Sequence, residues 1–215
     1  MLKIFGGRKP GLVGLDISAS AIKLLELSRD DGGYVVESYG VEPLPENTVV
    51  EQNIVDVEAV AEAIKRLQAS TQFKSKTAAV AVAGSAVITK TIEVPASLKE
   101  NQIEEQLLMD ADQYIPYPLD EVALDFQVLE ATARSEDMVD VLIAACRQEH
   151  IESRQAALEL SGLNPEVIDI EAHCVQRAIA LDLELFTRDP ALGLPDVLAI
   201  LDIGADMTTL SVVSG

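Results

Sequence analysis

The sequence predicts an α/β fold, and two observations support this prediction. Hydrophobic residues make up 48% of the 215 positions, whereas aromatic residues make up only 4% and Trp is absent. This composition indicates a globular protein with an aliphatic core of Val, Ile, Leu and Ala. Along the chain, segments with the two-residue period of strands alternate with segments that have the period of helices. At ~150 residues per domain, the length corresponds to between one and two domains.

The charge and the cysteine content argue against several classes of protein. The net charge is −20, so the protein repels phosphate backbones and anionic lipids, and nucleic acid is not an expected partner. Cys146 and Cys174 are far apart and form no C-x-x-C, which indicates neither a disulfide framework nor a zinc site. No stretch reaches the ~18 uncharged apolar residues of a membrane-spanning helix. These features predict a soluble protein of the reducing cytoplasm.

The first half of the chain reads as three strands, one helix and two further strands. Apolar residues recur at helical spacing from Val57 to Leu67, which predicts a helix that Asp56 caps. An Ala/Val run and then an alternating segment predict the two strands that follow, and Pro95 ends the second of them. The predicted strands of this half are 12–15, 22–27, 34–41, 77–83 and 87–94.

The second half begins with a helix that carries signals at both ends. Ser97 and Glu100 form the S-x-x-E pattern of a capping box, and the predicted helix runs to about Tyr114. The Ile-Pro-Tyr-Pro stretch from Ile115 stops it, because Pro lacks an amide donor. Gly162 ends a second helix. The other predicted elements are helices over 148–161 and 174–186, a loop over 187–195, and strands over 122–129, 138–145, 167–170, 198–203 and 210–213.

The periodicity breaks at Gly84, which predicts two separate sheets. The main sheet is expected to contain the strands 12–15, 22–27, 34–41, 77–83 and 167–170. A small sheet is expected to contain the strands 87–94, 122–129 and 138–145.

An internal repeat pairs the two ends of the chain. The ten residues from Leu15 to Leu24 align with those from Leu201 to Leu210, and Leu, Asp, Ile, Ala and the last Leu are identical in the two copies. In each copy a buried strand ends in an aspartate, a tight turn of small residues follows, and a second strand begins. Single strand-Asp-turn hairpins are common and often only architectural, but two matching copies favour a binding role.

The residues of this repeat suit a phosphate and its metal ion. Consecutive amides in a turn of small residues form a concave donor site for phosphate oxygens, and an aspartate at a strand end can hold Mg²⁺, directly or through water. Two such hairpins facing each other would clamp a triphosphate. The candidate phosphate-binding residues are Asp16, Ser18, Ala19, Ser20, Lys23, Gly204, Ala205, Asp206, Thr208 and Thr209, and the candidate metal ligands are Asp16 and Asp202.

At these residues the sequence resembles the actin-like ATPase superfamily and, within it, the PilM family of type IV pilus assembly proteins, with a more distant similarity to FtsA. The segments that carry the resemblance are 15–27, 41–47, 79–90 and 111–118. The resemblance implies an actin-like (ribonuclease H-like) ATPase domain with an inserted small α+β subdomain. It places the first lobe at 1–84 and 163–197, the insertion at 85–162, and the start of a truncated second lobe at 198–215. Ser18 is a departure, since many members have glycine there.

The resemblance also implies a function. It suggests a nucleotide-binding adaptor for ATP and Mg²⁺, with weak or no ATPase activity, that docks the N-terminal cytoplasmic tail of PilN at the inner face of the inner membrane and serves twitching motility. Other pilus assembly components and a second copy are further candidate partners. Glu171 resembles the acidic residue at the lobe connection, although a first-turn carboxylate favoured by the helix dipole explains it equally well. The alternative function is an ATP-dependent phosphotransferase of the sugar-kinase branch. The pattern of the insertion favours the adaptor, and ATP binding by this chain is expected to be weak.

Overall fold

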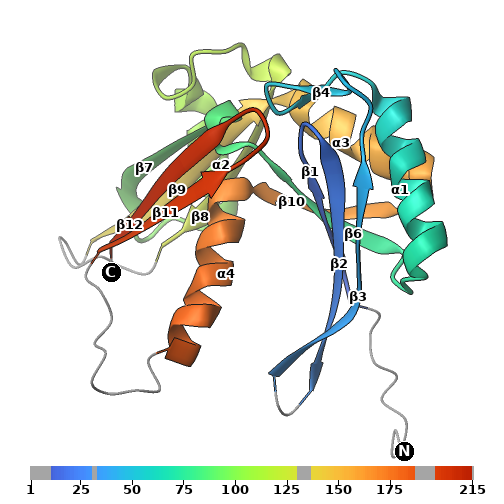
Figure 1. Ribbon diagram of the computed structural model, residues 1–215. Helices are drawn as coiled ribbons and strands as arrows, with labels where there is room; N and C mark the ends of the chain where they lie inside the picture. Colours follow the sequence, from blue (N-terminus) through green and yellow to red (C-terminus); the bar gives the residue numbers. More distant parts are fainter. Residues whose placement is uncertain (1–10, 31–32, 130–136, 187–196, 215) are drawn as a thin grey trace, which may run out of the picture. The chain divides into compact units, whose positions relative to one another are not determined.

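The computed structural model describes residues 11–30, 33–129, 137–186 and 197–214 (Figure 1). The chain divides into two compact units. The first contains Met1–Val82 and Ser153–Gly215, and the second contains Ala83–Glu152. None of the helices in the described ranges is long and apolar enough to cross a membrane.

The first unit is built on a five-stranded sheet with the order β10-β6-β1-β2-β3 (Figure 1). β1, β2 and β3 form an antiparallel meander, and β6 pairs in parallel with both β1 and β10. The bounds are β1 (Val13–Ile17), β2 (Ala21–Asp30), β3 (Gly33–Pro43), β6 (Thr77–Val82) and β10 (Asn164–Ile170). These are the five strands predicted for the main sheet, so that prediction is confirmed.

A β-bulge interrupts the pairing of β2 with β3. Glu26 pairs with Ser38, but Leu27 pairs with Val36, so Glu37 is an extra residue on β3. Such an insertion shifts the alternation of side chains along the bulged strand. On one side of the bulge, the Ser38 hydroxyl donates to the carbonyl of Thr71 in the neighbouring helix at 3.2 Å.

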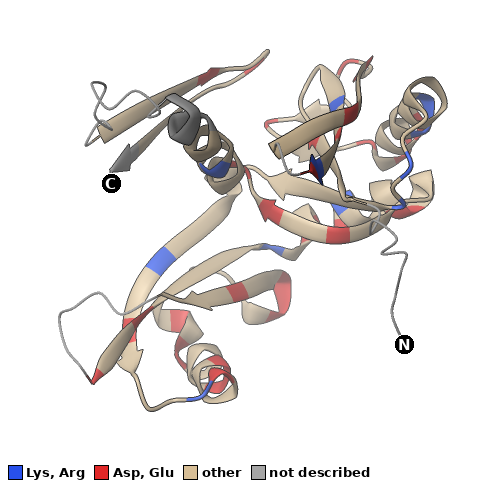
Figure 2. Ribbon diagram, turned by 90° about the horizontal axis from the view of Figure 1, so that it is seen from below, with Lys and Arg blue, Asp and Glu red and all other residues tan. Residues whose placement is uncertain are grey.

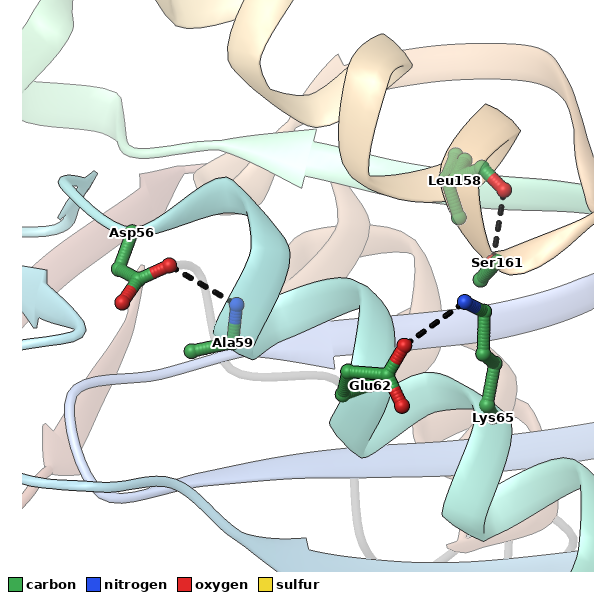
Figure 3. Close-up of polar contacts among 6 residues, drawn as sticks. All are labelled: Asp56, Ala59, Glu62, Lys65, Leu158 and Ser161. Carbon is green, nitrogen blue, oxygen red and sulfur yellow. Dashed lines mark hydrogen bonds and ion pairs between the residues drawn. The ribbon is translucent and has the colours of Figure 1, made fainter.

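Helix α1 (Val57–Thr71) packs against β2 and β3. Its N-cap is Asp56, whose carboxylate accepts from the amide of Ala59 at 2.9 Å (Figure 3). The predicted helix and its cap are therefore confirmed. The buried face of α1 joins one core with β1, β2, β6 and residues after 153, and this core includes Ile22, Leu24, Val60, Ile64, Leu67, Ala157 and Leu158. The sequence analysis missed two short strands before α1, β4 (Val49–Val50) and β5 (Asn53–Ile54).

Two further helices follow the second unit along the chain. α3 (Gln148–Ser161) has its predicted bounds and ends before Gly162, whose φ is 83°; the Ser161 hydroxyl donates to the carbonyl of Leu158 at 2.6 Å (Figure 3). The division between units falls inside α3, because its second half contributes to the core of the first unit. α4 (Glu171–Phe186) begins three residues earlier than predicted, since no helix breaker separates it from β10.

The second unit has its own sheet, with the order β7-β9-β8 and antiparallel pairing throughout. The predicted small sheet is thus confirmed. Its elements are η1 (Gly84–Ala86), β7 (Val87–Pro95), α2 (Glu100–Asp110), η2 (Ala111–Gln113), η3 (Leu119–Glu121), β8 (Val122–Val128) and β9 (Met138–Arg147). The core beneath α2 contains Val94, Ile103, Leu107, Val141 and Ile143.

The predicted capping box at Ser97 is wrong. α2 starts at Glu100, with Lys99 at the N-cap position and the Gln102 side chain accepting from the Lys99 amide at 3.0 Å. The reason is a turn after β7, in which the amide of Leu98 donates to the carbonyl of Pro95 at 3.0 Å. That turn includes Ser97, so the helix begins after it.

The C-terminal part of the first unit is a two-stranded hairpin of β11 (Val197–Ile203) and β12 (Thr208–Ser214). Both strands were predicted, although each begins one or two residues earlier. The loop predicted over 187–195 lies outside the described residues.

Candidate functional site

The two hairpins of the sequence repeat have the same register. In each, the strand-end aspartate pairs across the hairpin, Asp16 with Lys23 and Asp202 with Thr209. The next pair toward the turn encloses four residues in both cases, since Ile17 pairs with Ile22 and Ile203 pairs with Thr208. The alignment of the two copies is therefore an alignment of structure as well as of sequence.

The same hydrogen bond closes both turns. The amide of Ser18 donates to the carbonyl of Ala21 at 3.0 Å, and the amide of Gly204 donates to the carbonyl of Met207 at 2.9 Å. The Ser18 hydroxyl donates to the same Ala21 carbonyl at 2.8 Å, so both donors of Ser18 are used within its own turn. A Cβ at Gly204 would approach the Met207 carbonyl oxygen to 2.8 Å, which accounts for the glycine in the second copy.

The remaining amides of the two turns form the candidate phosphate site. In the part of the chain that the structure describes, the amides of Ala19 and Ser20 in the first turn and of Ala205 and Asp206 in the second have no protein acceptor. Successive free amides of this kind suit the oxygens of a phosphate. Of the backbone amides predicted from the sequence to bind phosphate, those in the middle of each turn therefore remain as candidates.

Asp16 and Lys23 form an ion pair on the hairpin surface. The Lys23 Nζ lies 2.7 Å from Asp16 Oδ2, and the two side chains are 58% and 45% exposed. The hydrogen bond that Lys23 donates to Asp16 raises the pKa of Lys23, whereas burial lowers it. The negative charges of Asp16, Asp202 and Glu171 raise it further. Lys23 therefore remains a cation, and at this exposure the pair itself contributes little stability.

Glu171 is the first residue of α4 and lies directly after β10. Burial raises the pKa of its carboxyl, and the negative charges of Asp16 and Asp202 raise it further, whereas Arg154 and Lys23 lower it. The helix dipole at this position acts in the opposite direction to burial, because it favours the ionised form. The structure therefore brings Asp16, Asp202 and Glu171 within electrostatic reach of one another, which the sequence repeat alone did not indicate for Glu171.

Arg154 is a buried cation of this region that the sequence analysis missed. It is only 3% exposed, and its guanidinium donates from Nε to the carbonyl of Ala81 at 2.7 Å and from Nη2 to the carbonyl of Gln52 at 3.1 Å. These contacts hold the end of β6 and the β4–β5 turn to α3. One feature of the sequence could have indicated its burial. Arg154 stands in α3 three positions before Ala157, which is buried, so the two residues share a helix face.

The charges of the site fit a bound Mg²⁺–phosphate group. No cluster of three His, Cys, Asp or Glu side chains suited to a metal occurs among the described residues. Mg²⁺ usually takes one or two carboxylates and completes its shell with water and substrate phosphates, so Asp16 and Asp202 meet its requirement. After burial, the negative charges of Asp16 and Asp202 also raise the pKa of Glu171, and a bound cation would relieve this repulsion.

The meander, the inserted unit and the paired hairpins define an actin-like α/β domain. The chain belongs to the type IV pilus assembly protein PilM family, whose model matches residues 14–215. The family resemblance seen in the sequence is thus confirmed.

Two solved structures are similar to this chain. A structure described as the PilM-PilN type IV pilus biogenesis complex matches with a TM-score of 0.76 and 31% identity, over 97% of this chain and 59% of that chain. This chain therefore spans about three fifths of that relative. A Bacteroides thetaiotaomicron protein with an actin-like ATPase fold and unknown function matches with a TM-score of 0.40 and 10% identity, over 100% of this chain and 69% of that chain.

Proposed function

We propose that this chain is part of an actin-like adaptor of type IV pilus assembly that binds ATP with Mg²⁺ and docks the N-terminal cytoplasmic tail of PilN at the inner face of the inner membrane. The nucleotide part of the proposal depends on one observation, the identical register and turn closure of the two hairpins. The partner is proposed from membership of the family and from the 31% identity with the protein of the PilM-PilN complex.

In the proposed complex, each hairpin contributes an aspartate and two free amides. Asp16 and Asp202 would hold Mg²⁺, and the amides of Ala19, Ser20, Ala205 and Asp206 would donate to phosphate oxygens. Lys23, which donates to Asp16 in this structure, would then be available to donate to the phosphates. The hydroxyls of Ser20, Thr208 and Thr209 are the further donors.

The adaptor role is favoured over a phosphotransferase by the second unit. That unit has its own sheet and its own core, as expected of an interaction module. A phosphotransferase would instead require a carboxylate base beside a substrate pocket.

The nucleotide site is tested by calorimetric titration with ATP–Mg²⁺. We expect weak or undetectable binding to this chain and measurable binding to a form extended to the length of the solved relative. In the extended form, Asp16→Ala and Asp202→Ala should each weaken binding, with the larger dependence on Mg²⁺ at Asp202. Glu62→Gln on the exposed face of α1 is the matched control. Unchanged affinity in both aspartate variants would show that the repeat is only architectural.

The partner is tested separately with a synthetic N-terminal peptide of PilN. An ordered apolar peptide should bind this chain in the micromolar range, about −8 kcal/mol. Its affinity should change little with salt, because screening acts chiefly on exposed charges. Absence of binding at both low and high salt would contradict docking by this chain. A steep loss with salt would instead indicate an acidic surface that recognises a basic tail.

A further inference from the structure

We propose that the exposed face of α2, in the second unit, binds a basic amphipathic helix of a partner protein. This surface, which we call the α2 face, consists of Glu104, Glu105, Leu108 and Met109. It lies outside the paired hairpins and goes beyond the function proposed above.

The geometry of α2 leaves two large apolar side chains in solvent. Ile103 and Leu107 are each 2% exposed and pack into the core of the second unit. Leu108 and Met109 follow on the other side of the helix and are 49% and 77% exposed. Residues four apart lie above one another on a helix, so Glu104 lies beside Leu108 and Glu105 beside Met109.

The charges on α2 are all of one sign. The helix contains four acidic residues and no Lys or Arg, and Asp112 lies two positions after its last residue. Within the described part of the chain, Glu104 and Glu105 form no ion pair. The C-terminal end of a helix carries partial negative charge and favours cations, yet the last turn of α2 has no basic residue. The α2 face is therefore a place where an external cation would be stabilised.

The same charges indicate which kind of partner fits. Residues 83–152 contain 15 acidic and four basic residues, and Figure 2 shows how few Lys and Arg lie among the acidic positions. A second copy would bring like charge against like charge, which is unfavourable. A basic amphipathic helix would pair its cations with Glu104 and Glu105 and cover Leu108 and Met109 with its apolar side. Met is flexible and polarisable, and so adapts well to such a partner.

The probe for this proposal is a synthetic 18-residue helix with Leu on one face and Lys on the other, titrated by fluorescence anisotropy at low and high salt. Leu108→Gln combined with Met109→Gln keeps helix propensity high and should weaken binding about tenfold, or ~1.4 kcal/mol. Leu160→Gln removes a comparably exposed leucine (52%) from α3 and should leave binding unchanged. An unchanged affinity in the α2 double variant would overturn the proposal.

A charge-matched pair of variants separates the α2 face from the general field of an acidic protein. Glu104→Gln with Glu105→Gln and, on α1, Glu58→Gln with Glu62→Gln change the net charge equally. We expect a loss of about tenfold for the α2 pair and less than about twofold for the α1 pair, and the loss should shrink at high salt. Equal losses in both pairs would show diffuse attraction without a site. Sedimentation that shows a dimer broken by the α2 apolar variant would also overturn the proposal, because the occupant would be a second copy.

Discussion

Glu26 should be one of the most sensitive polar positions of the first unit. Its side chain on β2 is buried, at 6% exposure, and its carboxylate accepts from the amide of Ser75 at 2.9 Å and from that of Lys74 at 3.2 Å. These bonds fix the segment that leads from α1 into β6. Glu26→Ala removes the acceptor, and the fully buried Ser75 then has an unsatisfied amide, which costs about 1–3 kcal/mol.

Lys74 is an exposed residue and its amide bond to Glu26 is only partly buried, so water can replace this acceptor and the loss adds less than that at Ser75. We therefore expect Glu26→Ala to lower the free energy of unfolding by about 2–3 kcal/mol. With an m-value of about 2 kcal/mol/M, the urea midpoint followed by far-UV circular dichroism should fall by roughly 1–1.5 M. Glu26→Gln keeps an acceptor oxygen and should recover part of this loss. The control is Glu62→Ala, because Glu62 is exposed and its ion pair with Lys65 lies on the surface of α1. Equal midpoints for the Glu26 and Glu62 alanine variants would refute the reasoning.

Two other predictions concern a helix cap and a titrating group. Asp56→Ala should lower the melting temperature in line with a loss of ~1 kcal/mol, and Asp56→Asn should retain most of the stability; equal losses in both would argue against the cap. The pKa of Glu171 is raised by burial and by Asp16 and Asp202, so its contribution to stability is present below its ordinary value of 4.5 and is lost as the pH rises through the folded value. Glu171→Gln should therefore raise the unfolding free energy at neutral pH and leave it unchanged in acid, as chemical denaturation at several pH values can check.

The strands of both sheets could be predicted because their apolar residues keep the two-residue period and are bounded by turn residues. The short strands β4 and β5 could not, since two residues each show no period. The start of α2 was misplaced at Ser97 because a capping pattern in sequence does not reveal that a preceding turn already uses the same residues. Local patterns therefore predicted the elements, and contacts between neighbouring segments corrected their ends.

For the candidate site too, local sequence patterns were predictive and contacts between segments were not. The repeat of Leu-Asp-Ile identified both hairpins, because identical spacing gives identical cross-strand pairs. The sequence could not show that the amide and the hydroxyl of Ser18 both donate to a carbonyl within their own turn. Nor could it show that Arg154 is buried beside this region, because its contacts join segments far apart along the chain.

Glu37, the extra residue of the bulge, determines which side chains of the edge strand β3 lie on the same side. Side chains alternate along a strand, so without the bulge Tyr34 and Val36 would lie on the opposite side of β3 from Tyr39 and Val41. With the bulge all four share one side, and they are 56%, 57%, 75% and 62% exposed. The single extra residue thus places all four side chains of this row on the same side of β3. Deletion of Glu37 should therefore leave the row on one side of β3, because Val36 would still pair with Leu27 and Ser38 with Glu26, now without the bulge between them.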